Sequence, residues 1–126
     1  MEMVKNKKEV KVTEELTAAA MGSGLLPVYA TPCLVALMEE TCHTSLKEML
    51  QEGQGTVGTR IDIKHLAATP IGMTVTCESE LVEIDGRRLV FNVTAYDDCG
   101  KVGEATHERF IIDNEKFMAK AEAKKA

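Results

Sequence analysis

The stretch that decides the fold spans residues 31–52 and reads TPCLVALMEETCHTSLKEMLQE. Its apolar and small side chains recur at steps of three and four residues, which predicts one buried stripe on a long amphipathic helix. Thr31 is expected to cap the helix start, Pro32 suits the first helical position, and Gly53 can terminate the helix just beyond its end. The members of the stripe are Leu34, Leu37, Met38, Thr41, Cys42, Ser45 and Met49.

Glu39 lies at the edge of this stripe and not on the solvent-facing side of the helix. A rotation of about 100° per residue places Glu40 and Lys47 toward solvent, whereas Glu39 falls near Val35 and Cys42. A carboxylate in that position is a candidate for acid–base chemistry. A glutamate at the rim that simply reaches solvent explains the pattern equally well.

Composition and charge limit the class of protein. The chain has 126 residues, of which 44% are hydrophobic and 28% charged, so we expect one globular domain over residues 1–126. A formal net charge of -5 argues against a nucleic acid partner, because phosphate binding favours a basic surface. No apolar run approaches the roughly 18 residues of a membrane span, and the segment Met1–Lys8 lacks the apolar core of a secretion signal. We therefore expect a cytoplasmic protein with no membrane partner.

The cysteines point to the same compartment. None of them forms a CxxC pair, so we expect reduced thiols. Neither they nor the three histidines show the spacing of metal ligands, so no metal site is expected. The four cysteines are Cys33, Cys42, Cys77 and Cys99.

The rest of the sequence predicts mainly strands. Alternating apolar side chains predict them over residues 9–13, 57–65, 73–81, 89–95 and 102–112. Asp85-Gly86 predicts a two-residue hairpin turn, and Asp113 can cap a charged C-terminal helix. This order argues against a parallel sheet and favours an α+β fold in which the last four strands form an antiparallel meander. A curved antiparallel sheet wrapped around the long helix would bury its apolar stripe.

An apolar loop precedes the long helix. Residues 13–21 are rich in helix formers, Gly22 can end that segment, and the loop follows over residues 23–30. Loops usually expose polar side chains, so the apolar ones here are expected to cover something. A flap over the core is the favoured explanation, and a lid over a ligand pocket is the alternative. The apolar loop residues are Leu25, Leu26, Val28 and Tyr29.

Two further residues are candidates for chemistry. His65 ends the buried face of its strand, and an imidazole with a pKa of about 6.5 suits proton transfer, although a structural histidine is more common there. Thr31 stands at the helix start, where the N–H groups of Cys33 and Leu34 can stabilise an oxyanion, although capping alone explains this threonine. The same helix start is expected to lower the pKa of the Cys33 thiol, for which no histidine partner is evident.

Basic side chains lie on several of the predicted strands. His107 and Arg109 share one face of the last strand, where we expect a structural partner for His107. Arg60, Lys64 and Arg88 could meet the phosphates of a ligand, although such charges usually mark a solvated face.

Five segments together resemble a known family. They are Leu37-Met38-Glu39, Gly55-Thr56-Val57-Gly58-Thr59, HLAATPIGMTV over residues 65–75, Gly86-Arg87-Arg88-Leu89 and Thr106-His107-Glu108-Arg109. In this order and with these gaps they resemble hotdog-fold acyl-CoA thioesterases, most closely the fluoroacetyl-CoA thioesterase-like branch, from about residue 29 to residue 120. The resemblance implies a hotdog fold: a curved antiparallel five-stranded sheet wrapped around one long central helix, with a short N-terminal lid segment and a C-terminal helix.

The resemblance also implies an activity and a site. Thr31, Glu39 and His65 would be catalytic in the hydrolysis of an acyl-CoA thioester, with Glu39 as general base or nucleophile. No cofactor is implied, because coenzyme A belongs to the substrate. The lid segment around residues 22–28 contains no Phe, which argues against fluoroacetyl selectivity and favours another short or medium acyl group. The expected substrate-binding residues are Gly58, Cys33, Leu25, Leu26, Tyr29 and Arg109.

The spacing of two of these residues raises a geometric question. Eight helical residues rise about 12 Å, so Thr31 and Glu39 cannot touch unless the helix begins later than expected. The resemblance implies a homodimer or a dimer of dimers with sites at the interface, and we expect a second subunit to complete the site. Three alternatives remain: a non-catalytic hotdog protein that binds acyl-CoA or another small ligand, a purely structural oligomer component, and a hotdog dehydratase.

Overall fold

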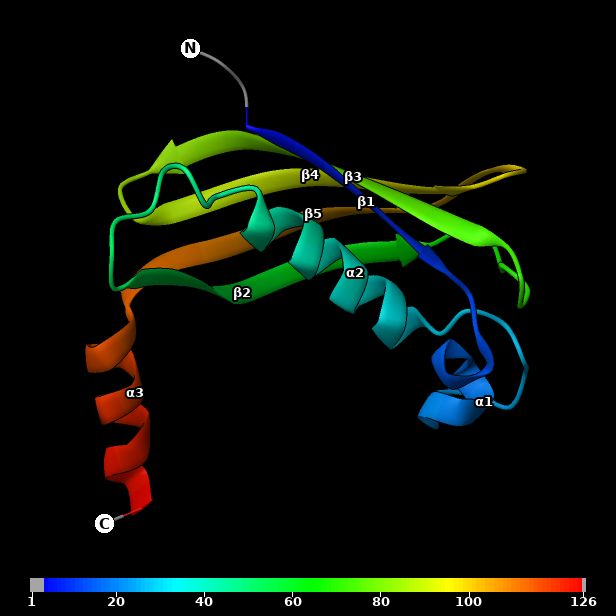
Figure 1. Ribbon diagram of the computed structural model, residues 1–126, viewed down its shortest axis with the longest axis horizontal. Coiled ribbons are helices and arrows are strands. Elements are labelled where there is room, and N and C mark those ends of the chain that lie inside the picture. The colour runs from blue at the N-terminus through cyan, green and yellow to red at the C-terminus, as the bar shows by residue number, and fades with distance from the viewer. Residues whose placement is uncertain (1–3, 126) are drawn as a thin grey trace.

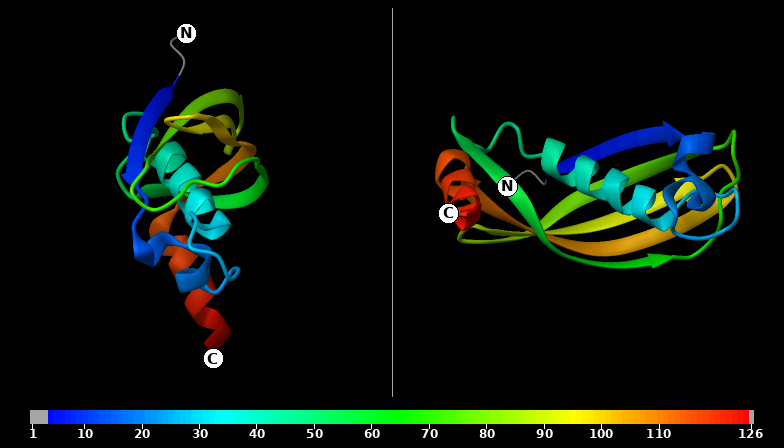
Figure 2. Two further views of the ribbon diagram at one scale, coloured as in Figure 1. Left: turned by 90° about the vertical axis from the view of Figure 1, so that its right-hand side faces the viewer. Right: turned by 90° about the horizontal axis from the view of Figure 1, so that it is seen from below.

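The computed structural model describes residues 4–125, which form one curved antiparallel sheet with a helix lying along its concave side (Figures 1 and 2). Residues 1–3 and 126, the two ends of the predicted 1–126 domain, lie outside the described residues, as does the start of the Met1–Lys8 segment. The strands are β1 (Lys5–Lys11), β2 (Gln54–His65), β3 (Thr74–Asp85), β4 (Arg88–Asp97) and β5 (Gly100–Asp113). The helices are η1 (Glu14–Leu16), α1 (Ala18–Met21), α2 (Thr31–Thr44), α3 (Asn114–Glu122) and η2 (Ala123–Lys125).

The strand order confirms the predicted sheet but corrects its topology. The order across the sheet is β1-β3-β4-β5-β2, so only β3, β4 and β5 form a meander. The predicted four-strand meander is wrong, because β2 pairs with β5 and lies at the edge. The connection over residues 66–73 is longer than a hairpin loop of two to five residues, which frees β3 to pair elsewhere. Alternation along β2 showed which face is buried but not which strand is its neighbour.

The central helix is shorter than predicted. It ends at Thr44 and not near residue 52, and Gly53 (φ 84°) lies in the turn before β2. Two hydroxyl groups compete for helical carbonyls at this end: Thr44 Oγ1 donates to Glu40 O at 2.6 Å, and Ser45 Oγ donates to Cys42 O at 2.6 Å. These local bonds accompany the change from helix to turn.

The start of α2 also differs from the prediction. The capping position is Ala30, and Thr31 is already helical, so the predicted cap at Thr31 is wrong. Pro32 lies in the first turn, as expected. The Thr31 hydroxyl is thereby free to bond another residue.

The core confirms the predicted buried faces except at Met49, which is 37% exposed and lies beyond the end of α2. The helix stripe packs against alternate residues of β3, β4 and β5, and burial of this apolar surface is the main stabilising term for the fold. The fully buried members include Leu34, Met38, Cys42, Val75, Cys77, Leu89, Phe91 and Ala95.

The chain ends and the hairpin need smaller corrections. β1 begins earlier than the predicted strand over residues 9–13, and Gly22 (φ 75°) ends α1 as expected. The hairpin loop is Gly86-Arg87, one residue later than predicted, because Asp85 pairs with Arg88 across the strands. Asp113 caps α3 by accepting from the N–H of Lys116, as predicted, and α3 projects away from the sheet (Figure 1).

Candidate active site

The start of α2 meets the end of β2 through one short hydrogen bond. Thr31 Oγ1 lies 2.7 Å from His65 Nδ1. Both residues line a pocket of about 300 Å³. The structure therefore brings together two of the three predicted catalytic residues. The rest of the lining is Ala18, Ser23, Val28, Tyr29, Leu66, Ala67 and Ala68.

The His65 ring is well suited to act as a base. Its Nε2 atom is buried and has no hydrogen-bond partner within residues 4–125. Burial lowers the pKa of His65 below its ordinary value of 6.5, because the charged form loses hydration. The neutral ring therefore predominates at pH 7, and Nε2 is an acceptor when Nδ1 carries the ring proton and donates to Thr31.

Only one of the two predicted oxyanion donors is available. The N–H of Leu34 already donates to Ala30 O at 3.0 Å, so this part of the prediction is wrong. Within the described chain, the N–H of Cys33 donates to no backbone carbonyl. The Cys33 amide therefore remains a donor at this helix start, and the Thr31 hydroxyl is a second one when His65 Nδ1 donates in the bond that they share.

Glu39 lies two turns further along α2, in a different cluster. Its Oε2 atom is 3.5 Å from Nη1 of Arg109, whose side chain is only 8% exposed, while that of Glu39 is 41% exposed. Arg109 donates from Nε to Thr56 Oγ1 at 2.8 Å and from Nη2 to Thr56 O at 3.0 Å. Its Nη1 also lies 3.2 Å from His107 Nε2. A buried, firmly held guanidinium thus faces the carboxylate.

Gly58 leaves the room that this cluster needs. It pairs with Arg109 across the β2–β5 ladder. A Cβ atom at this position would lie 2.7 Å from Glu39 Oε2, 3.2 Å from His107 Cε1 and 3.3 Å from Arg109 Nη1. The predicted site glycine therefore lies against the carboxylate, and its role here is to permit close approach.

The structure thus divides the predicted catalytic trio. Within residues 4–125, no hydrogen bond or ion pair joins the Thr31–His65 pair to Glu39. The eight-residue offset along α2 corresponds to about 12 Å. A single chain presents two half-sites on one helix.

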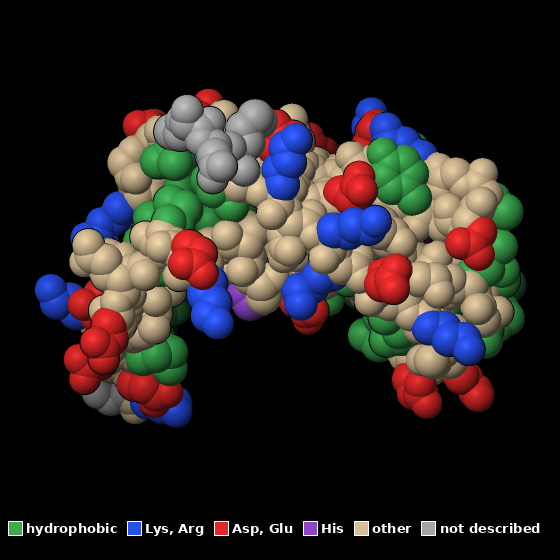
Figure 3. Space-filling model, turned by 45° about the horizontal axis from the view of Figure 1, so that its top comes forward, with side chains coloured by type: hydrophobic (Ala, Val, Ile, Leu, Met, Phe, Trp, Pro, Cys, Tyr) green, Lys and Arg blue, Asp and Glu red, His purple; other side chains and the backbone are tan. Residues whose placement is uncertain are grey.

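The apolar loop covers less than predicted. Tyr29 is buried, lines the pocket and donates its hydroxyl to Cys33 O at 3.2 Å. Leu25 is 93% exposed and Leu26 is 66% exposed, so neither forms a flap over the core of this chain. Hydrophobic side chains are exposed at the end of the molecule that carries α1 (Figure 3).

Cys33 also differs from the prediction. Its side chain is buried, and burial raises the pKa of its thiol. The predicted lowering by the helix start is wrong, because burial removes hydration from the thiolate form.

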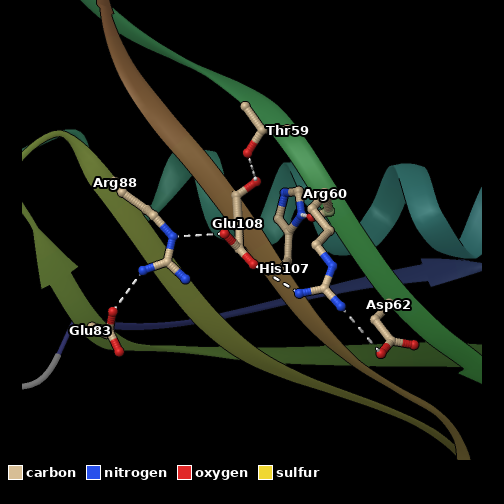
Figure 4. A network of polar contacts seen from close by, with 7 residues as sticks. All are labelled: Thr59, Arg60, Asp62, Glu83, Arg88, His107 and Glu108. Carbon is tan, nitrogen blue, oxygen red and sulfur yellow. Dashed lines mark hydrogen bonds and ion pairs between the residues drawn. The ribbon is translucent and has the colours of Figure 1, made fainter.

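The arginines considered for phosphate binding are already paired. Arg60 lies 3.2 Å from Glu108, and Arg88 lies 2.8 Å from Glu108 and 2.7 Å from Glu83 (Figure 4). This network occupies the face of the sheet away from α2. The alternative reading of these charges, a solvated face, fits better. Lys64 lines a polar hollow on the same face, together with Asp62.

The contact between His107 and Arg109 is the part of the site that the sequence did not specify. The alternating pattern of the last strand placed both side chains on one face, but their bonds depend on the register between β5 and β2.

Across the described residues, the structure holds no cluster of three His, Cys, Asp or Glu side chains that could bind a metal ion. None of the helices within residues 4–125 has the length and apolarity to cross a membrane.

Comparison with known proteins identifies the family of this chain. The sequence model of the fluoroacetyl-CoA-specific thioesterases matches residues 12–115. A fluoroacetyl-CoA thioesterase of Streptantibioticus cattleyicolor is 45% identical over 97 residues, which is 77% of this chain and 70% of the relative.

Solved structures give the same result and confirm the hotdog fold. The fluoroacetyl-CoA thioesterase FlK superposes with a TM-score of 0.91 at 36% identity, covering 95% of this chain and 93% of FlK. A thioesterase superfamily member of Thermus thermophilus superposes with a TM-score of 0.89 at 29% identity, covering 96% and 90% of the two chains. The chain belongs to the family of fluoroacetyl-CoA-specific thioesterases.

Proposed function

We propose that this protein hydrolyses a short or medium acyl-CoA thioester to the free acid and coenzyme A, with Thr31, Glu39 and His65 as catalytic residues. The observation that carries the proposal is the 2.7 Å contact between Thr31 and His65 in a pocket beside a helix start. Membership of a thioesterase family supports the reaction type. The unpaired state of all four cysteines supports a cytoplasmic location.

The chemistry follows from the groups available. Glu39 either takes a proton from water as the water oxygen attacks the thioester carbon, or attacks that carbon itself and forms an anhydride that water then opens. The carbonyl oxygen becomes an oxyanion, which the Cys33 amide and the Thr31 hydroxyl stabilise. The carbon–sulfur bond breaks as the oxyanion collapses, and His65 relays to the departing thiolate a proton that the consumed water supplies. No cofactor takes part.

The division of the site supports a dimer in which Glu39 of one subunit serves Thr31 and His65 of the other. β2 carries both Gly58 and His65, and it lies at the edge of the sheet, with β5 as its neighbour. A second copy can therefore approach both half-sites from this side. A larger assembly, such as a dimer of dimers, is compatible with the same contact.

The acyl group follows from the pocket and its surroundings. A volume of about 300 Å³ suits a short or medium acyl chain. The aliphatic side chains of Leu25 and Leu26 are exposed near this end, and we propose that they cover the acyl group once substrate and partner are bound. Their lack of an aromatic ring is the reason to expect an acyl group other than fluoroacetyl.

A thiol-release assay over acyl-CoAs of increasing chain length tests the activity. We expect Glu39→Gln to lower turnover at least about 100-fold, because it removes acid–base chemistry while keeping a side-chain oxygen for Arg109. Circular dichroism checks that the variant is folded. Wild-type turnover in this variant would reject the role of Glu39. Saturable binding of CoA with no thiol release by the wild type would favour a non-catalytic binding protein.

Subunit mixing tests the shared site. His65→Ala and Glu39→Gln are each expected to be inactive, with His65→Ala costing activity more than stability. Random exchange makes about half of the dimers mixed, and each mixed dimer has one complete site if the residues come from different subunits, so about a quarter of wild-type activity returns. No recovery on mixing would show that each site is built within one chain.

A further inference from the structure

His107 lies at the centre of the Glu39 cluster, although the proposed chemistry does not use it. It is only 1% exposed and points from β5 toward α2, packed near the ring of Phe91. Its Nδ1 lies 2.8 Å from the carbonyl oxygen of Arg60, and its Nε2 lies 3.2 Å from Nη1 of Arg109 (Figure 4 shows His107 beside Arg60). Both ring nitrogens are therefore engaged.

These two contacts determine which nitrogen carries the proton. A carbonyl oxygen can only accept, so Nδ1 must donate to Arg60 O. A guanidinium can only donate, so Nε2 must accept from Arg109 Nη1. Only the neutral ring protonated at Nδ1 satisfies both. Burial and the charge of Arg109 lower the pKa of His107, while the Arg60 carbonyl, Glu39 and Glu108 raise it, and the net shift is downward.

A β-bulge supplies the anchor for this ring. Gly58 pairs with Arg109 and Arg60 pairs with Glu108, so Thr59 is an extra residue in β2. Bulges interrupt the ladder and redirect side chains, and they are over-represented beside active sites. Here the Arg60 carbonyl at the bulge accepts from His107, which fixes the ring relative to Gly58.

We propose that His107 is a positioning residue that holds Arg109, and through it Glu39, in the geometry for thioester hydrolysis. This inference rests on the proposed function of Glu39. Thr56 fixes the Nε and Nη2 edge of the guanidinium, whereas Nη1 is held by His107 at 3.2 Å and by Glu39 at 3.5 Å. Without an acceptor at His107, only the Thr56 bonds at the opposite edge and the longer Glu39 contact hold the guanidinium.

Protonation of His107 would reverse this arrangement. Its Nε2 would become a donor facing another donor, and two cations would lie side by side at the carboxylate of Glu39. The charged groups that face the ring are Arg109 from its own strand and Glu39 from α2, while Glu108 acts from the opposite face of the sheet. The positioning function therefore needs the neutral ring.

Two amide variants separate positioning from mere packing. The Gln side chain in His107→Gln can place its oxygen where Nε2 lies and accept from Arg109. The shorter side chain in His107→Asn can donate to Arg60 O but does not reach Arg109. We expect kcat to fall about tenfold or more in His107→Asn with little change in KM, and to stay within about threefold of wild type in His107→Gln.

The remaining measurements make each outcome decisive. Melting temperatures of the two variants are compared, and the inference requires that the difference in kcat exceed what their stabilities explain. Equal kcat in the two variants, whether high or low, would overturn it. Nitrogen-15 NMR of the wild type should show His107 protonated at Nδ1 and not at Nε2, and the opposite tautomer would also overturn it. If Glu39 does not have its proposed catalytic role, Glu39→Gln keeps wild-type turnover. That result is distinct from the ones that would overturn the role of His107.

Discussion

The two half-sites on α2 are built in opposite ways. At the helix start, Thr31 is exposed and has one side-chain bond, to His65, in an open pocket. Two turns later, Glu39 faces a guanidinium that is itself fixed by Thr56 and His107. The first region is open and can adapt to a substrate, whereas the second is preorganised before any substrate arrives. Electrostatic stabilisation is most effective from such fixed groups, so the comparison predicts different responses to substitution.

Among substitutions at Thr31, Gly58 and Tyr29, removal of the Thr31 hydroxyl should have the largest effect. In Thr31→Val, the oxyanion and His65 both lose a partner, and we expect kcat/KM to fall about 100-fold. Stability should change little, because Thr31 does not cap the helix. Thr31→Ser keeps the hydroxyl and is the matched control. A large drop in melting temperature in Thr31→Val, with activity lost in proportion, would assign this threonine a structural role instead.

A methyl group at Gly58 should disturb the preorganised half-site around Glu39. The added Cβ would lie 2.7 Å from Glu39 Oε2, so the carboxylate must move. We expect Gly58→Ala to lower kcat about 30-fold, since small misplacements of catalytic groups are costly. The control is Gly55→Ala on the same strand, where the added atom meets the side chain of Asn114. Equal activity in the two variants would contradict the tight packing of Glu39 against β2.

The same contrast explains what the sequence could and could not predict. The helical and strand periodicities came from local burial, so the existence of the central helix and most of the buried faces were predicted, although the helix ends at Thr44 and not near residue 52. The contact between Arg109 and Glu39 joins residues 70 positions apart, and it depends on β2 lying beside β5 and on the bulge at Thr59. Register between distant strands leaves no local pattern. The resemblance to known thioesterases identified Thr31, Glu39 and His65 as candidates. It could not show that a single chain holds Glu39 apart from the other two.

Substitution of Tyr29 should have a smaller effect, on the half-site that contains Thr31 and His65. Tyr29 lines both the pocket of Thr31 and His65 and a more apolar pocket of about 230 Å³ whose lining includes Leu16 and Leu37, and we infer that its ring divides the two. Tyr29→Ala should join the two spaces and raise the ratio of kcat/KM for octanoyl-CoA over acetyl-CoA about fivefold. The cavity should also cost about 3 kcal/mol of stability, so rates are measured well below the melting temperature.

Tyr29→Phe keeps the dividing ring and removes only the bond to the Cys33 carbonyl. Its chain-length preference should match that of the wild type. If Tyr29→Ala also leaves the preference unchanged, the acyl chain does not extend toward this ring.

The pH dependence of stability is the smallest of the expected effects, and it compares the two half-sites directly. Burial lowers the folded-state pKa of both His65 and His107, so near pH 6 the unfolded chain binds more protons than the folded one. The free energy of unfolding should therefore be unaffected by these rings above about pH 6.5 and should fall as the pH drops below it. Urea unfolding at pH 7.5, 6.5 and 5.5 measures this fall. It should become shallower in His65→Gln and shallower still in His107→Gln, because His107 is more deeply buried and lies beside Arg109. If both histidine variants show the same fall in stability as the wild type, neither half-site holds its histidine neutral, and the pH dependence gives no support for a more rigid half-site around Glu39.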